Sequence, residues 1–547
     1  MKKLLFLLSV SFFACKVSIS NPIENNNKAS EERIFLGLES SVIYENNINI
    51  KINSKNSFAS CLKTLEREGC IINSVKDGIR KDEKYVYAKI PENYAQTLSK
   101  IRKMKEVIFA EPDYLIKIWP NETEAFDVKN TLTLNDPIFE SKGYSLKITK
   151  ALKAYEEIGY GQKTVWAGII DTGTNANHED LKLEDGTKLV KILKSAFTED
   201  GTQTPTFNDV VSGNSDTDEG SEGHGTHCSG IIAAIGNNEK GISGVAWKNL
   251  NLISYKALYN GTGSEQTIYS ALKDLTDEIR ALVPISEQAT IPVNLSLGGG
   301  HAGQFALEMI NYALSKGILP IVAMGNEAQI LPSYPAAFPG VLSVGSTDGK
   351  DKKSNFSTSG AWINLVAPGS RIISLKNNQN DGYIYMSGTS MATPFVTGVA
   401  SYLLSFDSSL TPYQIIALLE SSADKIGFPY PYEQQYDANG FSLFYGYGRV
   451  NVYEATRMLK DGKIPEIGKK YIEKVLTIEV PNNEPIHIYS EKTGVLITMV
   501  MAKEEKNSNN KHEAEVRGLQ EGKYEIVYRE NMKTITINDM ANVKVTF

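Results

Sequence analysis

Residues 165–173 have the sequence VWAGIIDTG, an apolar run that ends at Asp171 and a glycine turn. Short apolar runs of this kind are typical of strands that are buried on both faces of a sheet. Four further runs of the same type follow along the chain, at residues 252–258, 293–297, 318–324 and 341–344.

Segments with helical periodicity lie between these runs, at residues 268–282, 304–316 and 391–404. Strands that alternate with helices predict an α/β domain of three layers with a mostly parallel sheet. Open parallel sheets place their functional sites at the carboxyl ends of the strands, so we expect the residues that follow the runs to meet along one edge.

The length and charge of the chain limit its class. At 547 residues it is too long for one ordinary domain, so we expect two or three. With 41% hydrophobic residues it has enough apolar material for a large core. A net charge of −7 argues against the basic surface that nucleic acids need, and we expect no nucleic-acid partner.

Three segments contain the residue types of nucleophilic catalysis. The first run ends in Asp171-Thr172-Gly173, residues 224–230 are HGTHCSG, and residues 388–394 are GTSMATP. A serine hydroxyl is a weak nucleophile, so it needs a base to accept its proton, and the base needs a carboxylate that fixes its tautomer. Ser390, His224 and Asp171 supply these groups. The helix predicted after Ser390 tolerates Pro394 only in its first turn.

These three segments resemble the signature blocks of the subtilisin family, and HGTHC is most similar to its thermitase and proteinase K branches. The resemblance covers about residues 135–458. It implies a subtilisin-like fold and a serine endopeptidase that cleaves proteins and peptides with Asp171, His224 and Ser390. Beside this triad we expect His227 to be structural and Cys228 to be a buried packing thiol.

Other positions match the family's substrate-binding segments. Asn326, in the sequence AMGN, is implied to be the side-chain donor of the oxyanion hole. Peptide is implied to bind as an added strand between two segments of the chain, with apolar S1 and S4 pockets and Glu265 near the S4 rim. The implied substrate-binding residues are Gly263, Ser296, Leu297, Gly298, Ala323 and Gly325.

The resemblance also implies a structural calcium site of the thermitase type. Carboxylate, amide and backbone oxygens are the ligands that this hard cation prefers. The implied ligands are the side chains of Asp136, Asp180 and Asn238 with the backbone of Ile235, Lys240 and Ile242. A second acidic stretch at residues 209–222 is compatible with calcium, but a solvated loop is the simpler interpretation.

Residues 33–119 form a small α+β unit by their periodicity, and this unit resembles the inhibitory propeptide of the family. By that resemblance Trp119 occupies the S1 pocket during self-cleavage. Pro120 is a poor leaving residue, which leaves the junction open within the connector. The further boundaries that we predict are a connector at residues 120–134, a catalytic domain at 135–460 and a small β-sandwich at 465–547 with Leu519 and Tyr524 in its core.

The first 20 residues have the layout of a signal peptide. Lys2 and Lys3 precede an apolar run that is too short to span a bilayer, and a flexible leader follows at residues 21–32. Either Cys15 is lipidated, as in bacterial lipoproteins, or cleavage occurs near Ser20. We therefore expect a secreted or cell-envelope protein that contacts membrane only through a lipid at Cys15.

Four cysteines are too few for a disulfide framework in an exported protein of this length, although Cys61 and Cys70 could pair.

Two other functions compete with the protease hypothesis. One is a catalytically inert subtilisin-like scaffold that binds partners through its C-terminal domain. The other is an α/β-hydrolase esterase, against which the sequence offers no Gly-x-Ser-x-Gly elbow.

Overall fold

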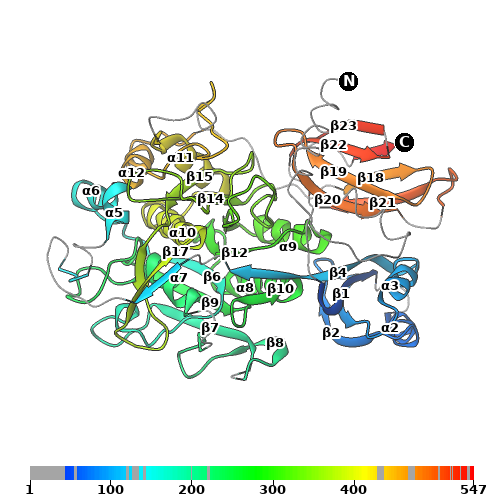
Figure 1. Ribbon diagram of the computed structural model, residues 1–547, viewed down its shortest axis with the longest axis horizontal. Coiled ribbons are helices and arrows are strands. Elements are labelled where there is room, and N and C mark those ends of the chain that lie inside the picture. Colours follow the sequence, from blue (N-terminus) through cyan, green and yellow to red (C-terminus); the bar gives the residue numbers. More distant parts are fainter. Residues whose placement is uncertain are drawn as a thin grey trace, which may run out of the picture. The chain divides into compact units, whose positions relative to one another are not determined.

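The computed structural model describes residues 43–53, 58–118, 122–125, 135–138, 143–198, 200–217, 222–427, 436–465, 475–502, 506–517, 519, 521–529, 531–538 and 543–547 (Figure 1). The predicted signal peptide, the flexible leader, Trp119 and Pro120 lie outside these residues. Among the helices that are described, none is both long enough and apolar enough to cross a membrane.

An eight-stranded sheet forms the centre of the catalytic region, in the order β15-β14-β13-β11-β6-β9-β7-β8. Neighbouring strands are parallel throughout, except that β7 and β8 are antiparallel. In chain order the strands are β6 (Val165–Asp171), β7 (Val190–Phe197), β8 (Gln203–Asp209), β9 (Leu250–Lys256), β11 (Ile291–Leu295), β13 (Ile318–Ala323), β14 (Leu342–Thr347) and β15 (Leu365–Pro368).

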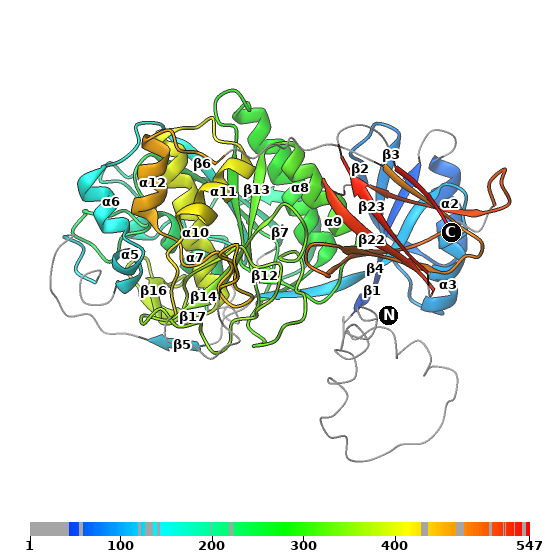
Figure 2. The ribbon, with the colours of Figure 1, turned by 90° about the horizontal axis from the view of Figure 1, so that it is seen from above.

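Helices cover both faces of this sheet (Figure 2). On one face α8 (Glu265–Leu282) and α9 (Gln304–Ser315) share a core with Ile170 of β6. On the other, α7 (His224–Ala233) and α10 (Thr389–Phe406) pack with Ala167 and Ile169 of the same strand. This alternation explains the continuous apolar runs, because a strand covered on both sides needs apolar residues at every position. The predicted three-layer α/β fold is confirmed.

Shorter elements complete the catalytic region. They are α5 (Tyr144–Ile148), α6 (Ala151–Glu157), the 3₁₀ helix η1 (Glu179–Leu181), α11 (Pro412–Ser422), α12 (Val452–Lys460), and a small antiparallel sheet of β16 (Ile372–Leu375), β17 (Tyr383–Ser387) and β5 (Glu122–Ala125).

The segment before the catalytic region is an antiparallel sheet with two helices. Its sheet order is β4-β1-β3-β2, and its own core includes Ile48, Leu65 and Ile101. The elements are β1 (Ile43–Asn53), α2 (Phe58–Arg67), β2 (Ile71–Asp77), β3 (Glu83–Lys89), α3 (Tyr94–Arg102) and β4 (Val107–Ile118).

The pairing of Cys61 with Cys70 that the sequence left open does not form. Both residues are buried free thiols in the core of this segment. Burial raises the pKa of each thiol to about 11, which keeps them protonated and unreactive.

The C-terminal region consists of two small sheets, in the orders β21-β18-β24 and β20-β19-β22-β23. Leu519 and Tyr524 are buried, as the sequence predicts. The strands are β18 (Val475–Val480), β19 (Pro485–Ser490), β20 (Leu496–Met501), β21 (His512–Arg517), β22 (Gly522–Tyr528), β23 (Asn531–Ile537) and β24 (Val543–Thr546).

Candidate active site

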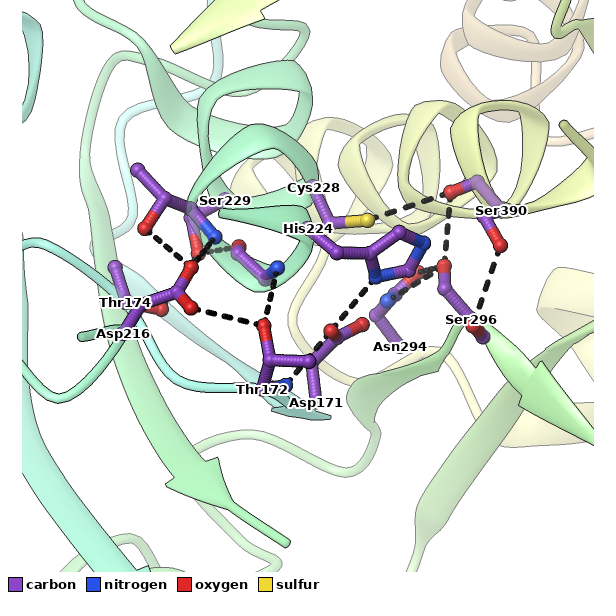
Figure 3. Close-up of polar contacts among 12 residues, drawn as sticks. Asp171, Thr172, Thr174, Asp216, His224, Cys228, Ser229, Asn294, Ser296 and Ser390 are labelled. Carbon is purple, nitrogen blue, oxygen red and sulfur yellow. Dashed lines mark hydrogen bonds and ion pairs between the residues drawn. The ribbon is translucent and has the colours of Figure 1, made fainter. Parts of the chain in front are cut away.

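The three motifs meet where β6, α7 and α10 come together (Figure 3). Asp171 is the last residue of β6, His224 the first residue of α7, and Ser390 the second residue of α10. All three side chains are buried, with at most 1% of their surface exposed. A carboxylate, an imidazole and a hydroxyl therefore lie together, shielded from solvent by other parts of the chain.

Asp171 and His224 form a direct hydrogen bond. Nδ1 of His224 lies 2.7 Å from Oδ1 of Asp171, and the same carboxylate oxygen accepts the backbone N–H of Thr172 at 2.7 Å. When Nδ1 donates to a carboxylate, Nε2 is the nitrogen with the free lone pair. Within the described part of the chain this Nε2 has no hydrogen-bond partner. The imidazole is thus oriented as a proton acceptor.

The Ser390 hydroxyl points to a different acceptor in this structure. Its Oγ donates to the carbonyl oxygen of Ser296 at 3.2 Å. Nucleophile–base bonds are often long or misaligned without substrate and tighten only in the reacting complex.

Pro394 corrects one expectation from the sequence. It is the sixth residue of α10, beyond the first turn to which the sequence assigned it. Having no N–H, it cannot bond the carbonyl of Ser390 four residues earlier. That carbonyl accepts Ser296 Oγ at 2.8 Å and Cys228 Sγ at 3.4 Å. The helix tolerates the proline because two side chains replace the missing bond.

Asn326 is held by the residue that precedes Ser390. Its Oδ1 accepts the backbone N–H of Thr389 at 3.0 Å and the Thr389 hydroxyl at 2.9 Å. Both of these bonds use the carbonyl end of the amide, and Nδ2 is the donor end. Ala323 ends β13, and Gly325 turns the chain toward Asn326 with φ of +100°.

Two short strands of the catalytic region hold the end of β4. β10 (Thr262–Ser264) and β12 (Leu297–Gly298) both pair antiparallel with β4, and Figure 1 shows β4 extending between them. Ile116 lies opposite Gly263, Lys117 opposite Gly298, and Ile118 opposite Leu297. The predicted substrate-pairing glycines thus hold an extended strand, and that strand belongs to the chain itself.

Acidic residues of β4 also contact two helices of the catalytic region. Glu111 accepts the backbone N–H of Phe305 at 2.8 Å and of Gln304 at 3.1 Å, at the start of α9. Asp113 accepts the N–H of Gln266 at 2.9 Å, in the first turn of α8. Both carboxylates satisfy orphan donors at helix N-termini.

Glu265 is buried, with Oε1 3.2 Å from Nδ1 of His301. The sequence expected this residue near the rim of the S4 pocket.

The residues predicted to bind calcium converge on the loop at residues 235–242. Asp136 accepts the N–H groups of Asn237 and Asn238, at 2.9 and 3.1 Å. Asp180 accepts Asn238 Nδ2 at 2.9 Å and the N–H of Ile242 at 3.0 Å.

Two features of this loop bear on the fit to a cation. Neither carboxylate forms an ion pair with a lysine or arginine of the described residues, and burial raises the pKa of Asp180 to about 6. Oδ1 of Asn238 accepts Lys240 N–H, so a cation at this place needs that amide turned over. The backbone N–H of Ile235 donates to the Asp180 carbonyl at 2.9 Å. The donor set fits a hard cation in kind.

His227 and Cys228 lie beneath the site. Nε2 of His227 lies 3.1 Å from the carbonyls of Ile372 and Ile384, and burial lowers the pKa of this histidine to about 3. Burial also raises the pKa of the Cys228 thiol well above its usual range. A neutral histidine and a protonated thiol fit the structural roles that we expected of both.

Asp216 is a residue that the sequence reasoning missed. The interpretation of residues 209–222 as a solvated loop is wrong for Asp216, which is fully buried and accepts hydrogen bonds from Thr172 and Thr226 (Figure 3). Thr172 and Thr226 both lie within the quoted motifs. The nearness of Asp216 to the second motif in the chain is the only sequence feature that could have indicated its role.

Comparisons with known proteins agree with the fold. A model of the subtilase family matches residues 162–448. Thermitase from Thermoactinomyces vulgaris is 34% identical over 329 residues, which cover 59% of this chain and 99% of thermitase. A thermophilic serine proteinase from Bacillus sp. (strain AK1) is 28% identical, covering 82% of this chain and 96% of its own.

A solved structure has the same fold. Fervidolysin from Fervidobacterium pennivorans, described as a keratinolytic enzyme related to subtilisin, superimposes with a TM-score of 0.63 at 19% identity, covering 93% of this chain and 79% of its own. The fold and the site thus define a subtilisin-like serine protease. The chain belongs to the subtilase family, and it acts on protein substrates.

Proposed function

We propose that the protein is an exported serine endopeptidase whose catalytic triad is Asp171, His224 and Ser390. The single observation that supports this most is the 2.7 Å bond between His224 Nδ1 and Asp171 Oδ1, which leaves Nε2 as a base. Rotation of the Ser390 side chain from the Ser296 carbonyl to Nε2 then prepares the nucleophile. An inert scaffold would need no such alignment of buried groups.

The reaction follows from these positions. His224 Nε2 takes the proton of Ser390 Oγ as that oxygen attacks the scissile carbonyl, and Asp171 stabilises the imidazolium. Asn326 Nδ2 and the Ser390 N–H donate to the oxyanion, whose charge exists only in the tetrahedral intermediate. His224 then protonates the leaving amine, and water hydrolyses the acyl-enzyme by the same route.

We also propose that residues 33–119 act as an inhibitory propeptide and that the described chain is the zymogen. Support comes from β4, which fills the groove between β10 and β12 and runs toward Ser390. Ile118, the last residue of β4, pairs with Leu297, which follows the Ser296 whose carbonyl accepts the Ser390 hydroxyl, so self-cleavage in the segment that begins at Trp119 is the expected maturation step.

A structural calcium ion at Asp136, Asp180 and Asn238 belongs to the proposal. Carbonyl oxygens of Ile235, Lys240 and Ile242 would complete the ligands. The ion would neutralise two carboxylates that lack a basic partner in the described structure and would hold the loop at residues 235–242 to η1.

Export completes the proposal, through the signal layout of residues 1–20 with Cys15 or a site near Ser20 as the processing point. Mass spectrometry of the mature N-terminus would distinguish a lipidated cysteine from simple cleavage, and an unprocessed Met1 would contradict export.

The decisive variant is Ser390→Ala in the full chain. We expect it to stay a full-length precursor when purified alone and to hydrolyse casein at background rate, because the nucleophile is absent. Wild-type protein should mature and react with a fluorophosphonate probe, whereas an inert scaffold would not. A Ser390→Ala protein that still matures and cleaves casein would contradict the triad.

A further inference from the structure

Asp216 is a buried carboxylate to which the reaction above gives no role. Its side chain is 0% exposed, and three hydrogen bonds reach its two oxygens. Oδ1 accepts the Thr172 hydroxyl at 3.0 Å, and Oδ2 accepts the Thr226 N–H at 2.9 Å and the Thr226 hydroxyl at 2.7 Å.

The two threonines adjoin the two partners of the triad's buried pair. Thr172 follows Asp171, and its N–H donates to the carboxylate oxygen that also binds His224. Thr226 lies two residues after His224 in the first turn of α7. Asp216 therefore joins the end of β6 to the start of the helix that presents the imidazole (Figure 3).

The first turn of α7 depends on these outside groups. Its N-cap residue is Gly223, whose lack of a side chain leaves the first N–H groups without a local acceptor. Thr172 Oγ1 accepts the N–H of Gly225 at 3.0 Å, and Asp216 accepts that of Thr226. Gly225 also lets the two elements touch, since a Cβ there would lie 2.1 Å from the Gly173 carbonyl.

Resting on the proposed triad, we propose that Asp216 is a positioning residue for the reaction. Its carboxylate fixes the first turn of α7 against the end of β6 and so holds the His224 imidazole in line with Asp171 and Ser390. A negative charge near a helix N-terminus is also favourable, so the helix dipole of α7 stabilises the contact with Asp216.

Asp216→Ala tests the proposal in enzyme matured by tagged wild-type protease that is then removed. We expect kcat per titrated site to fall by about 10²-fold with KM within about twofold, because a small misplacement of a catalytic group costs that much. The acidic limb of the kcat/KM profile should move to lower pH, since a loosened Asp171 stabilises the imidazolium less.

A second pair of variants tests the same proposal in case Asp216→Ala does not fold. Thr226→Val deletes the hydroxyl that donates to Asp216, whereas Thr226→Ser keeps it. The same hydroxyl accepts the backbone N–H of Asn175 at 3.0 Å, so the valine variant loses both bonds and the serine variant keeps both. We expect kcat to fall by on the order of tenfold in the valine variant and by less than twofold in the serine variant.

Thr411→Ala is the matched control, because it removes the capping box of the distant helix α11. It should lower Tm without changing kcat or the pH profile. The proposal is overturned if folded Asp216→Ala keeps kcat within about threefold of wild type, if its pH profile does not move, or if Thr226→Val and Thr226→Ser have equal kcat. Ser390→Ala distinguishes failure of this proposal from failure of the proposed triad, because residual activity in that variant would contradict the triad itself.

Discussion

At the scale of single residues, the site depends on side chains whose orientation is set by a second contact. Asn326 is the clearest case, because Thr389 binds its Oδ1 twice, through its N–H and its hydroxyl. A donor that is already oriented costs no reorganisation when the oxyanion forms. In the proposed reaction, Thr389 thus positions the amide that would donate to the oxyanion.

Asn326→Leu should therefore lose activity, and it should also lose some stability because two buried Thr389 donors lose their acceptor. We expect kcat to fall by about 10²–10³-fold, the range found on removing one oxyanion-hole donor, with KM nearly unchanged. Steady-state kinetics on a peptide amide would measure this, with active sites counted by a fluorophosphonate. A loss that appears only in KM would mean that Asn326 binds substrate in its ground state.

At the scale of elements, the loop at residues 235–242 is held by two carboxylates from outside it. Asp136 precedes the catalytic helices in the chain and Asp180 lies in η1, so the loop ties together segments that are distant in sequence. Calcium at this place would stabilise the folded protein by mass action, because the unfolded chain does not bring the ligands together.

Chelation should therefore lower the melting temperature of the full-length Ser390→Ala protein, which cannot digest itself during the scan. We expect Tm to fall in EGTA and to recover with excess Ca²⁺ but not with Mg²⁺, whose smaller coordination shell fits such loops poorly. Asp180→Asn should abolish the dependence. An unchanged Tm in EGTA would contradict the proposed calcium site.

At the scale of the whole molecule, a buried charge network joins the first α+β segment to the catalytic region. Nζ of Lys51 lies 2.8 Å from Oε2 of Glu308 in α9 and 3.0 Å from Oε2 of Glu83, and the Tyr85 hydroxyl donates to Glu308 at 2.7 Å. All four side chains are less than a tenth exposed. Removing one partner of such a network leaves a buried charge uncompensated.

Lys51→Met should weaken the binding of the proposed propeptide to the catalytic region. The cost of breaking a buried pair, about 3–5 kcal/mol, corresponds to a dissociation constant that is roughly 10²–10⁴-fold higher. Gel filtration of Ser390→Ala protein, cleaved at the junction in trans, would measure the bound fraction. Lys100→Met, which breaks the solvent-exposed pair with Glu68, is the control and should have little effect.

Acid strengthens the same association through a second cluster. Glu111, Glu265 and His301 converge beside Gly303, where a Cβ would lie within 3.2 Å of all three, and the Tyr114 ring stacks on His301. Burial raises the pKa of Glu111 and of nearby Asp113 to about 7 and that of Glu265 well above its usual range.

Proton uptake on association determines whether binding strengthens or weakens as the pH rises. A carboxyl group whose pKa is higher in the complex gains a proton on association, so these groups weaken binding as pH rises from about 4 to above 7. His301 opposes them between about pH 4 and 6.5, because burial lowers its pKa to about 4. With three carboxyls against one imidazole, the bound fraction of propeptide should fall from pH 5.5 to 8.5. Glu265→Gln should flatten the profile, and a bound fraction that rises with pH would contradict the prediction.

The sequence by itself determined the layers and the three motifs. Continuous apolar runs such as residues 165–170 identify strands covered on both faces, and periodicity over residues 391–404 predicts the helix that follows Ser390. These are local properties, because burial pattern and capping involve residues a few positions apart.

Only the tertiary structure decided how distant groups meet. Lys51 reaches Glu308 across 257 positions, and β4 joins strands that follow it by more than a hundred residues. Asp216 looked like one acid among several in a polar stretch, and Pro394 looked like a residue that must stand in the first turn of its helix. The role of each residue depends on a hydrogen-bonding partner that is distant in the sequence. A hydrogen bond requires proximity in space, and local sequence patterns do not indicate which distant residues come close.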